Sequence, residues 1–376
     1  MPTLEGKPLS TIVVGRLGTD IWARQDGETY DSAARAAEAR ELAALIALTD
    51  LEALARRASR LRHGMPCTVP RPQYDPGARS SVMGGMNYHI ELCLDDGVSW
   101  IARIRRFNAT SPPAPLRDYI LRSEVATLRF LEGTAVPAPK VYDFALEGPE
   151  NPVGVGFILM DKLPGKSLRW SLATPEERRR VMDQIANTFV ELHSHAFDLL
   201  GSLLDTPGGL AVGAFARESL TDFGGSNMTT IGPCSSWQDY RLASLQLTLK
   251  LISREEMYTQ RPVDAYLIHR SLTDLGDHIL VDDDFNVTGI IDWEWAHTAP
   301  PEHAFNSPVG FLPVSEFYGG NTAIGGGEAV FAELLEGRGR RDLAEHARNG
   351  RVQISLTFAA AMAWKTGMGF SGCLRG

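Results

Sequence analysis

An acidic stretch near residue 290 holds the residues best suited to chemistry. Residues 279–293 read ILVDDDFNVTGIIDW, in which two apolar segments enclose an acidic turn and the second segment leads to Asp292. This pattern predicts a β-hairpin. A carboxylate that follows a buried strand suits Mg²⁺, which prefers hard oxygen ligands. We therefore interpret Asp292 as a metal ligand and residues 282–284 as a solvated turn.

A glycine pair and two arginines lie upstream of this stretch, and both residue types are compatible with phosphate binding. Gly84 and Gly85 precede one predicted strand, and Arg103 and Arg105 lie on the next. Glycine lets backbone N–H groups approach a phosphate, and arginine binds phosphate in bidentate fashion. Both arginines share a strand face because side chains alternate. An ordinary turn and exposed edge-strand charges remain alternatives, and without GxGxxG the pattern does not support a dinucleotide-binding fold.

Strands must position these residues in the first part of the chain. The segments YHIELCL (88–94) and VSWIARI (98–104) flank the turn sequence Asp95-Asp96-Gly97, which predicts a β-hairpin. One or two helices are expected within 32–62 and another at 121–132. The prolines of VPAPKVYDF favour an extended segment, and residues 155–160 are typical of a buried strand.

The later part of the chain is predicted to be mostly helical. A helix is expected after Thr174, because Thr is a good N-cap, Pro175 fits the first turn and Glu177 completes a capping box. Another is expected at 237–252. Residues 201–236 are rich in Gly and Ser with few periodic apolar residues, which predicts a long surface loop. The apolar stretch 352–370 is interrupted by a lysine and a glycine and favours a packed helix over a membrane span.

Composition and charge exclude several classes of protein. The 376 residues are 44% hydrophobic and 22% charged, which is typical of a globular protein. The net charge is 37 − 46 = −9 without a long basic run, so no nucleic-acid partner is expected. Four cysteines lack metal-ligand spacing and indicate a reducing compartment. No secretion signal or membrane partner is expected, which places the protein in the cytoplasm; the oligomeric state is not encoded in any visible pattern.

Four blocks of sequence, taken in order, resemble the aminoglycoside phosphotransferase family and its fungal branch in particular. They cover most of residues 80–305 and read SSVMGGMNYHIELCLDDGVSWIARIRR, SEVATLRFLEGTAVPAPKVYDFALE, VGVGFILMDKLPGKSL and GDHILVDDDFNVTGIIDWEWAHTAP. The resemblance implies an α+β, protein-kinase-like bilobal fold with ATP between the lobes. The implied regions are an N-terminal helical extension (1–79), a β-rich N-lobe (80–160), and a hinge with a helical C-lobe (161–376).

The resemblance also implies roles for individual residues. ATP and Mg²⁺ are the implied cofactors, and a small molecule with a hydroxyl group is the implied acceptor. Arg103 matches the phosphate-contacting cation, and Glu124 matches the carboxylate that holds it. Met160 falls in the hinge beside adenine, although it is equally compatible with the core. The phosphate-covering loop corresponds to Gly84, Gly85, Met86 and Asn87.

The residues around the metal block are open to more than one interpretation. Asp277 and His278 are candidate metal or phosphate neighbours, with Asp277 the better Mg²⁺ ligand because imidazole suits Mg²⁺ poorly. Glu294 and Glu302 either line the acceptor side and attract a cationic substrate or, more commonly for such residues, are exposed helix charges. The two histidines near the end of the helix after Thr174, His193 and His195, are interpreted as capping or surface residues.

The catalytic loop departs from the family pattern. Relatives carry His-x-Asp before the metal block, whereas an ungapped alignment here places Ser271 and Thr273 at those positions. One interpretation is that a strand and its turn are missing between residues 275 and 276. The other is that Asp274, the nearest upstream carboxylate, serves as the base. The sequence therefore leaves open a weakened phosphotransferase, a nucleotide-binding pseudokinase and a non-catalytic binding protein.

Overall fold

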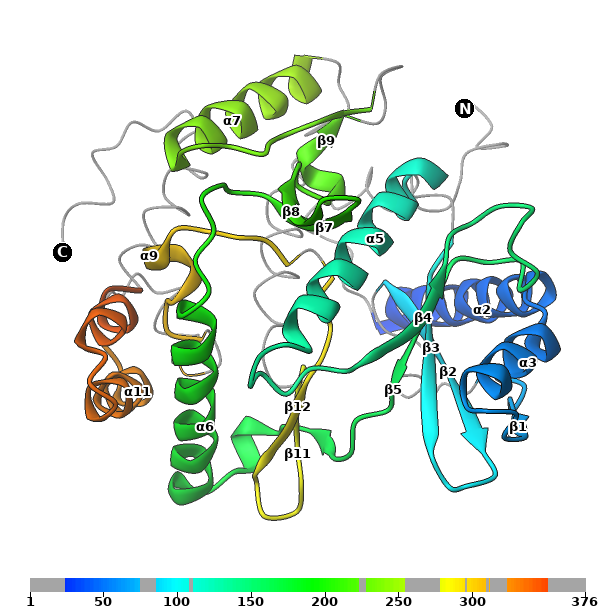
Figure 1. Ribbon diagram of the computed structural model, residues 1–376, viewed down its shortest axis with the longest axis horizontal. Helices are drawn as coiled ribbons and strands as arrows, with labels where there is room; N and C mark the ends of the chain where they lie inside the picture. The colour runs from blue at the N-terminus through cyan, green and yellow to red at the C-terminus, as the bar shows by residue number, and fades with distance from the viewer. Residues whose placement is uncertain are drawn as a thin grey trace.

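An antiparallel sheet of five strands dominates the first half of the chain. A computed structural model describes residues 24–74, 86–107, 111–222, 228–253, 278–294, 296–308, 311 and 323–350. The strand order in the sheet is β1-β2-β3-β5-β4 (Figure 1). The strands are β1 (Cys67–Thr68), β2 (Asn87–Leu94), β3 (Ser99–Arg105), β4 (Val141–Ala145) and β5 (Phe157–Asp161). The predicted hairpin is confirmed as β2 and β3, and Gly97 in its turn has φ +84°, a value that favours glycine.

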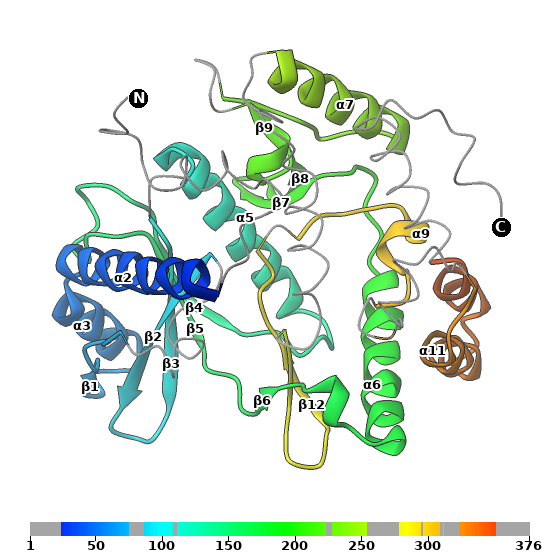
Figure 2. The same ribbon diagram turned by 180° about the vertical axis from the view of Figure 1, so that it is seen from behind.

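Helices pack on the two faces of this sheet (Figures 1 and 2). On one face Ile90 of β2 belongs to the same buried core as Leu54 of α3, and on the other Ile158 of β5 packs with Leu128 of α5. Each face of the sheet therefore has its own apolar cluster. The helices are α2 (Arg24–Leu48), α3 (Leu51–Leu61) and α5 (Ala114–Leu131), as expected for the segments 32–62 and 121–132.

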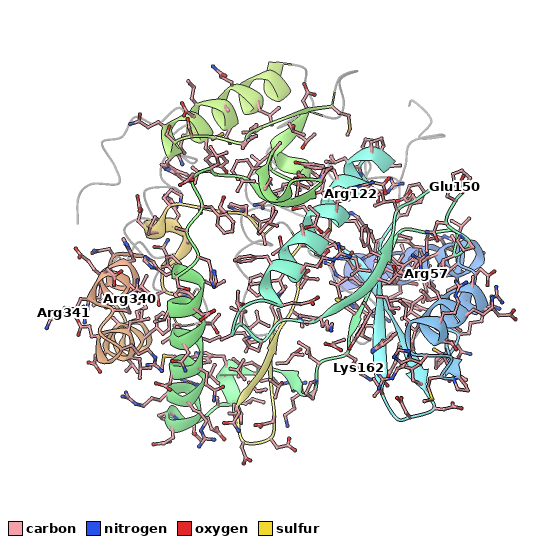
Figure 3. All side chains as sticks on the ribbon, in the orientation of Figure 1. Arg57, Arg122, Glu150, Lys162, Arg340 and Arg341 are labelled. Carbon is pink, nitrogen blue, oxygen red and sulfur yellow. The ribbon has the colours of Figure 1, made fainter. Side chains whose placement is uncertain are left out.

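Ion pairs fasten the first two helices to the sheet. Glu41 of α2 accepts hydrogen bonds of 2.8 and 2.9 Å from Arg106, the residue after β3. Arg57 of α3 donates to both carboxylate oxygens of Asp143 in β4. Figure 3 shows Arg57 beside the five-stranded sheet and Arg340 on the far side of the molecule near α11. Helices α2 and α3 thus share one core and one set of ion pairs with the strands.

The second half is mostly helical around a sheet of order β12-β11-β6. The predicted capping box is confirmed, because Thr174 Oγ1 accepts from the Glu177 amide and Glu177 Oε2 accepts from the Thr174 amide, at 3.3 and 2.7 Å. Ile185 of α6, Val281 of β11 and Phe331 of α11 belong to one buried core. The elements are β6 (Lys166–Ser167), α6 (Pro175–His193), α7 (Trp237–Ser253), β11 (Ile279–Val281), β12 (Val287–Ile290), α9 (Pro301–Ala304) and α11 (Gly326–Gly337).

The prediction of a long surface loop at 201–236 is wrong. The segment contains a hairpin of β7 and β8, and Tyr119 of α5 donates a hydrogen bond of 2.8 Å to the Ala214 carbonyl next to it. Glycines at 201, 208, 209 and 213 interrupt the alternation of apolar and polar residues that would have indicated strands. The hairpin is instead buried by its contact with α5. The elements are β7 (Ser202–Thr206), β8 (Gly209–Gly213), η2 (Glu218–Leu220), β9 (Thr221–Asp222) and β10 (Thr229–Thr230).

The connection from β5 to β6 is held against the hairpin that precedes Asp292. Gly165 has φ +106°, and a Cβ there would lie 2.7 Å from the Val281 carbonyl oxygen, so only glycine fits. The Thr288 hydroxyl donates to the Pro164 carbonyl at 2.5 Å. The connection from β5 to β6 therefore packs closely against β11 and β12.

No described helix is both long enough and apolar enough to cross a membrane. The helix predicted at 352–370 lies outside the described residues. Of the cysteines in the described residues, Cys67, Cys93 and Cys234 are free thiols.

Candidate active site

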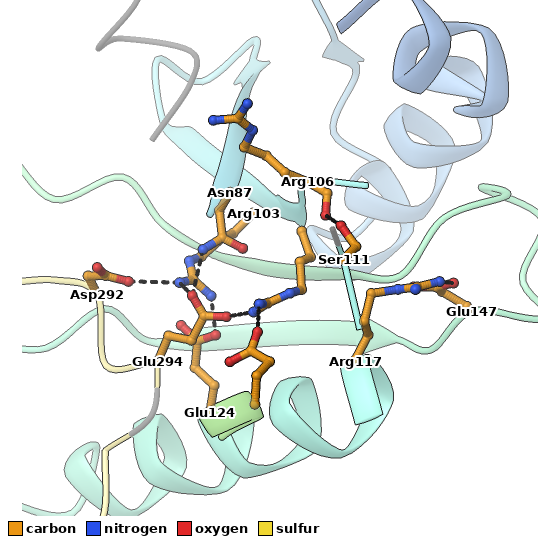
Figure 4. Close-up of polar contacts among 11 residues, drawn as sticks. Asn87, Arg103, Arg106, Ser111, Arg117, Glu124, Glu147, Asp292 and Glu294 are labelled. Carbon is orange, nitrogen blue, oxygen red and sulfur yellow. Dashed lines mark hydrogen bonds and ion pairs between the residues drawn. The ribbon is translucent and has the colours of Figure 1, made fainter. Parts of the chain in front are cut away.

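Arg103 lies at the centre of a buried network of ion pairs (Figure 4). Its side chain projects from β3 and is only 5% exposed. One guanidinium nitrogen donates to Glu124 of α5, and the other donates to Asp292 at 2.8 Å and to Glu294 at 3.0 Å. Burial raises the pKa of Glu124, and the positive charge of Arg103 opposes that rise. Arg103 thus joins the sheet, α5 and the segment after β12.

Glu294 corrects one interpretation of the sequence. It was expected to be an exposed helix charge or part of the acceptor side, but its side chain is 3% exposed. One of its oxygens accepts hydrogen bonds from Arg103 and from Asn87, the latter at 2.8 Å, and the other accepts from Arg105. Arg105 also donates to Glu218 of η2. The shared strand face of the two arginines, predicted from alternation, brings both to this carboxylate.

Asp292 lies two residues beyond the end of β12 and has φ +64°. This left-handed conformation is uncommon for residues other than glycine, although Asp and Asn adopt it more readily than most. Its side chain is 41% exposed. One oxygen accepts from Arg103, and the other lies 3.3 Å from Nδ1 of His278. The carboxylate therefore keeps accessible surface while its direction is fixed.

His89 is a residue that the sequence interpretation missed. It pairs with Arg103 across the β2–β3 ladder, as Asn87 pairs with Arg105, so all four side chains share one face. Burial, followed by the charge of Arg103, lowers the pKa of His89 to about 4, and Asp292 acts in the opposite direction. Its imidazole is therefore neutral at neutral pH. Alternation in the segment YHIELCL was the available signal.

The structure brings together five of the predicted site residues. Met86, by contrast, is exposed, and its carbonyl accepts from the Arg106 amide. Met160 is buried in the cluster with Ile158, as its core interpretation expects. The residues brought together are Asn87, Arg103, Glu124, His278 and Asp292. The predicted positions Gly84, Gly85, Asp274 and Asp277 lie outside the described residues.

The remaining charged candidates lie apart from this network. Glu302 is exposed on α9. His193 contacts Arg340, with its Nδ1 at 2.7 Å from the guanidinium, and His195 lies 3.2 Å from Glu191 one turn earlier on the chain. Both histidines thus contact charged side chains at the end of α6, and Ser194 is the C-cap of this helix.

Two curated proteins show partial sequence similarity to this chain. A subtelomeric hrmA-associated cluster protein of Aspergillus fumigatus is 35% identical over 136 residues, which are 35% of this chain and 26% of that protein. A second such protein, from another strain of the same fungus, is 35% identical over 133 residues, 35% of this chain and 25% of its own length. The alignment spans about a quarter of these relatives.

Solved structures of low sequence identity are also similar. The GDP complex of wild-type aminoglycoside 2'-phosphotransferase-IIIa has 16% identity and a TM-score of 0.35, covering 76% of this chain and 86% of that one. A macrolide 2'-phosphotransferase from Brachybacterium faecium has 14% identity and a TM-score of 0.38, and the alignment covers 85% of this chain and 94% of that one. A putative fructosamine-3-kinase from Thermobifida fusca has 16% identity and a TM-score of 0.39, and the alignment covers 78% of this chain and 97% of that one.

The sequence model of the phosphotransferase enzyme family (APH) matches residues 87–307, which is more than half of the chain. The matched segment runs from Asn87 at the start of β2 past Asp292 and Glu294, so it includes every described residue of the network. The predicted resemblance and the α+β, kinase-like fold are confirmed, and this chain belongs to the phosphotransferase enzyme family.

Proposed function

We propose that this chain is an ATP- and Mg²⁺-dependent phosphotransferase that acts on a hydroxyl group of a small molecule, and that its altered catalytic loop weakens the activity. The observation that carries the proposal is the hydrogen bond of 2.8 Å between Arg103 and Asp292. It joins a buried cation of the sheet to a partly exposed carboxylate of the second half. A cation and a metal-binding carboxylate side by side are what a nucleotide phosphate with its metal requires.

The residues at Asp292 fit a magnesium ion. Within the part of the chain that the structure describes, no group of three or more His, Cys, Asp or Glu residues has the arrangement of a metal cage. Mg²⁺ does not need one, because it is usually held by one or two carboxylates together with phosphate oxygens and water. The accessible carboxylate of Asp292 supplies such a ligand, and we propose Asp277 as a second. When bound, Mg²⁺ would neutralise charge on the nucleotide phosphates.

The protein residues then have separate roles in binding and orientation. Arg103 would contact a phosphate oxygen while Glu124 holds its guanidinium in place. The loop of Gly84 and Gly85 would cover the phosphates, and the hinge near Met160 would border adenine. His278 would lie close to the phosphates and orient Asp292. The net charge of −9 favours a neutral or cationic small acceptor over a nucleic acid, and the free thiols suit the cytoplasm.

A nucleotide-binding pseudokinase is the second candidate. It is favoured by the departure of the catalytic loop from the pattern that the family resemblance implies. In an ungapped alignment, Ser271 and Thr273 would occupy the positions of the His and Asp that the family resemblance implies for the catalytic loop. General-base catalysis contributes about 10² to 10⁴-fold, and positioning supplies most of the remaining acceleration in phosphoryl transfer. Loss of the base alone would therefore leave a weak enzyme. Loss of the whole strand and turn between residues 275 and 276 would also remove support from the metal block.

Calorimetry tests nucleotide and metal binding. We expect ATP to bind with Mg²⁺ and the affinity to fall at least about tenfold in Asp292→Asn, a change that keeps the left-handed conformation accessible. Asp283→Asn, in the exposed turn of the same hairpin, is the matched control and should bind like wild type. Equal affinity in Asp292→Asn and wild type, with and without Mg²⁺, would contradict the proposed site.

Turnover separates the enzyme from the pseudokinase. ATP consumption should be measured with a panel of hydroxyl-bearing small molecules in wild type, in Asp274→Asn, and in a chain with a relative's strand and H-x-D-D-K turn inserted between residues 275 and 276. We expect weak wild-type turnover, a rise after insertion and little change in Asp274→Asn. ATP binding without turnover in any of the three indicates the pseudokinase, whereas loss of a robust activity in Asp274→Asn identifies Asp274 as the base.

A further inference from the structure

Glu294 is shared by three donors that come from two neighbouring strands. Its Oε2 accepts from Arg103 and Asn87, and its Oε1 accepts from Arg105. Asn87 begins β2 and is the last residue of the predicted phosphate-covering loop, and the arginines lie near the end of β3. A single carboxylate therefore joins the open end of the β2–β3 hairpin to the segment that carries Asp292 two residues earlier.

Electrostatics requires an acidic residue at this position. Arg103 and Arg105 are two residues apart on one strand face, so their guanidinium groups repel each other in a region shielded from water. Burial lowers the pKa of Arg105, the charge of Glu218 opposes this, and the neighbouring Arg103 lowers the pKa further. A carboxylate with one oxygen on each guanidinium offsets that repulsion. Glu124 and Glu218 each contact one of the two arginines, whereas Glu294 contacts both.

The geometry also fixes a direction for Arg103. The same guanidinium nitrogen that binds Glu294 at 3.0 Å binds Asp292 at 2.8 Å. If Glu294 is replaced by Gln, only one acceptor oxygen remains for Asn87, Arg103 and Arg105, and no negative charge lies between the two guanidinium groups. Arg103 then keeps Glu124 as its buried partner but no longer has a fixed approach to Asp292.

We propose that Glu294 is a positioning residue for nucleotide binding, which holds Arg103, Arg105 and Asn87 together and sets the distance between the phosphate-contacting cation and the metal-binding carboxylate. This inference rests on the proposed function, because it assumes that phosphate and metal bind at Arg103 and Asp292. It assigns Glu294 to the assembly of the site through the two arginines, and not to direct contact with the acceptor.

Glu294→Gln tests the proposal, because it keeps the size of the side chain and removes its charge. We expect the Kd for ATP in the presence of Mg²⁺, measured by calorimetry, to rise at least about tenfold. Glu218→Gln removes the second partner of Arg105 and leaves the contacts of Arg103 and Asn87 intact, so its Kd should change less than about threefold. Glu302→Gln, at an exposed site on α9, is the control for loss of one negative charge.

A melting temperature for each variant separates positioning from stability. A purely structural role predicts a lower melting temperature for Glu294→Gln and a Kd within twofold of wild type, and that result would overturn the proposal.

If Glu294→Gln does not fold, Asn87→Ser decides: a rise in Kd of about threefold or more supports the proposal and an unchanged Kd rejects it. If wild type binds no nucleotide, the proposed function fails and this inference fails with it. If wild type binds ATP and the Kd rises in Glu294→Gln but not in Glu218→Gln or Glu302→Gln, the result supports both the proposed function and the role of Glu294.

Discussion

The two faces of the β2–β3 hairpin have opposite character. On the face toward α2 and α3, Tyr88, Ile90, Leu92, Trp100, Ala102 and Ile104 are almost fully buried in an apolar core. On the other face, Asn87, Arg103 and Arg105 bind carboxylates from α5, from η2 and from the segment after β12. The same two strands thus supply both packing energy and a charged site.

The difference shows how one hairpin separates stability from function. The apolar face is covered by helices that lie before the hairpin in the sequence. Any hydrophobic side chain that fits the space can pack on that face. The charged face needs partners at particular positions, because a buried charge without its counter-charge is costly. Substitutions on the first face should therefore change unfolding free energy, and substitutions of Asn87, Arg103 or Arg105 on the second should change nucleotide binding.

The largest effect is expected on the apolar face. Ile90 is 1% exposed, so Ile90→Ala should lower the free energy of unfolding by about 3 kcal/mol through lost burial and a cavity. Chemical denaturation measures this loss. The folded fraction should retain its ATP affinity within twofold, and a large loss of affinity at full folding would show that the two faces are not separable.

A pH effect of about 2 kcal/mol is expected from His89 on the charged face. Its pKa is about 4 in the folded chain, so the unfolded chain binds more protons between about pH 6.5 and pH 4. Stability is therefore lost as the pH falls through this window. Denaturation at pH 7 and pH 4 should show a smaller loss in His89→Gln than in wild type. Equal losses, or an NMR titration of His89 near 6.5, would contradict the burial of this imidazole.

A coupling on the order of 1 kcal/mol is expected between Arg103 and Glu124. Both side chains are buried, so removing either partner should weaken ATP binding, and removing both should cost less than the sum. A double-mutant cycle with Arg103→Met and Glu124→Gln, read by calorimetry, gives the coupling. Additive effects would mean that Glu124 does not act through Arg103.

The smallest effect is expected at the other end of the charged face. Glu91 of β2 accepts a hydrogen bond of 2.6 Å from Lys162, which is labelled in Figure 3, and both side chains are partly exposed. Glu91→Gln should change the free energy of unfolding by about 0.3 kcal/mol, as is usual for exposed pairs. Urea denaturation at low and high salt measures the change. A loss comparable to that of Ile90→Ala would remove the contrast between the faces.

The sequence by itself determined the features that depend on near neighbours. Alternation and the turn at Gly97 predicted the β2–β3 hairpin and the shared face of Arg103 and Arg105, and the residues after Thr174 predicted the start of α6. The ordered blocks predicted the family. These signals are local, because period and capping involve residues within a few positions of one another.

Only the tertiary structure decided which charges are buried together. Glu294 appeared to be an exposed charge, yet it pairs with Arg103 from a distance of 191 residues along the chain. Residues 201–236 appeared to be a loop, yet they form a hairpin against α5 and supply Glu218 to Arg105. No local pattern specifies such partners, because the burial that makes a carboxylate bind an arginine arises only when distant segments pack together.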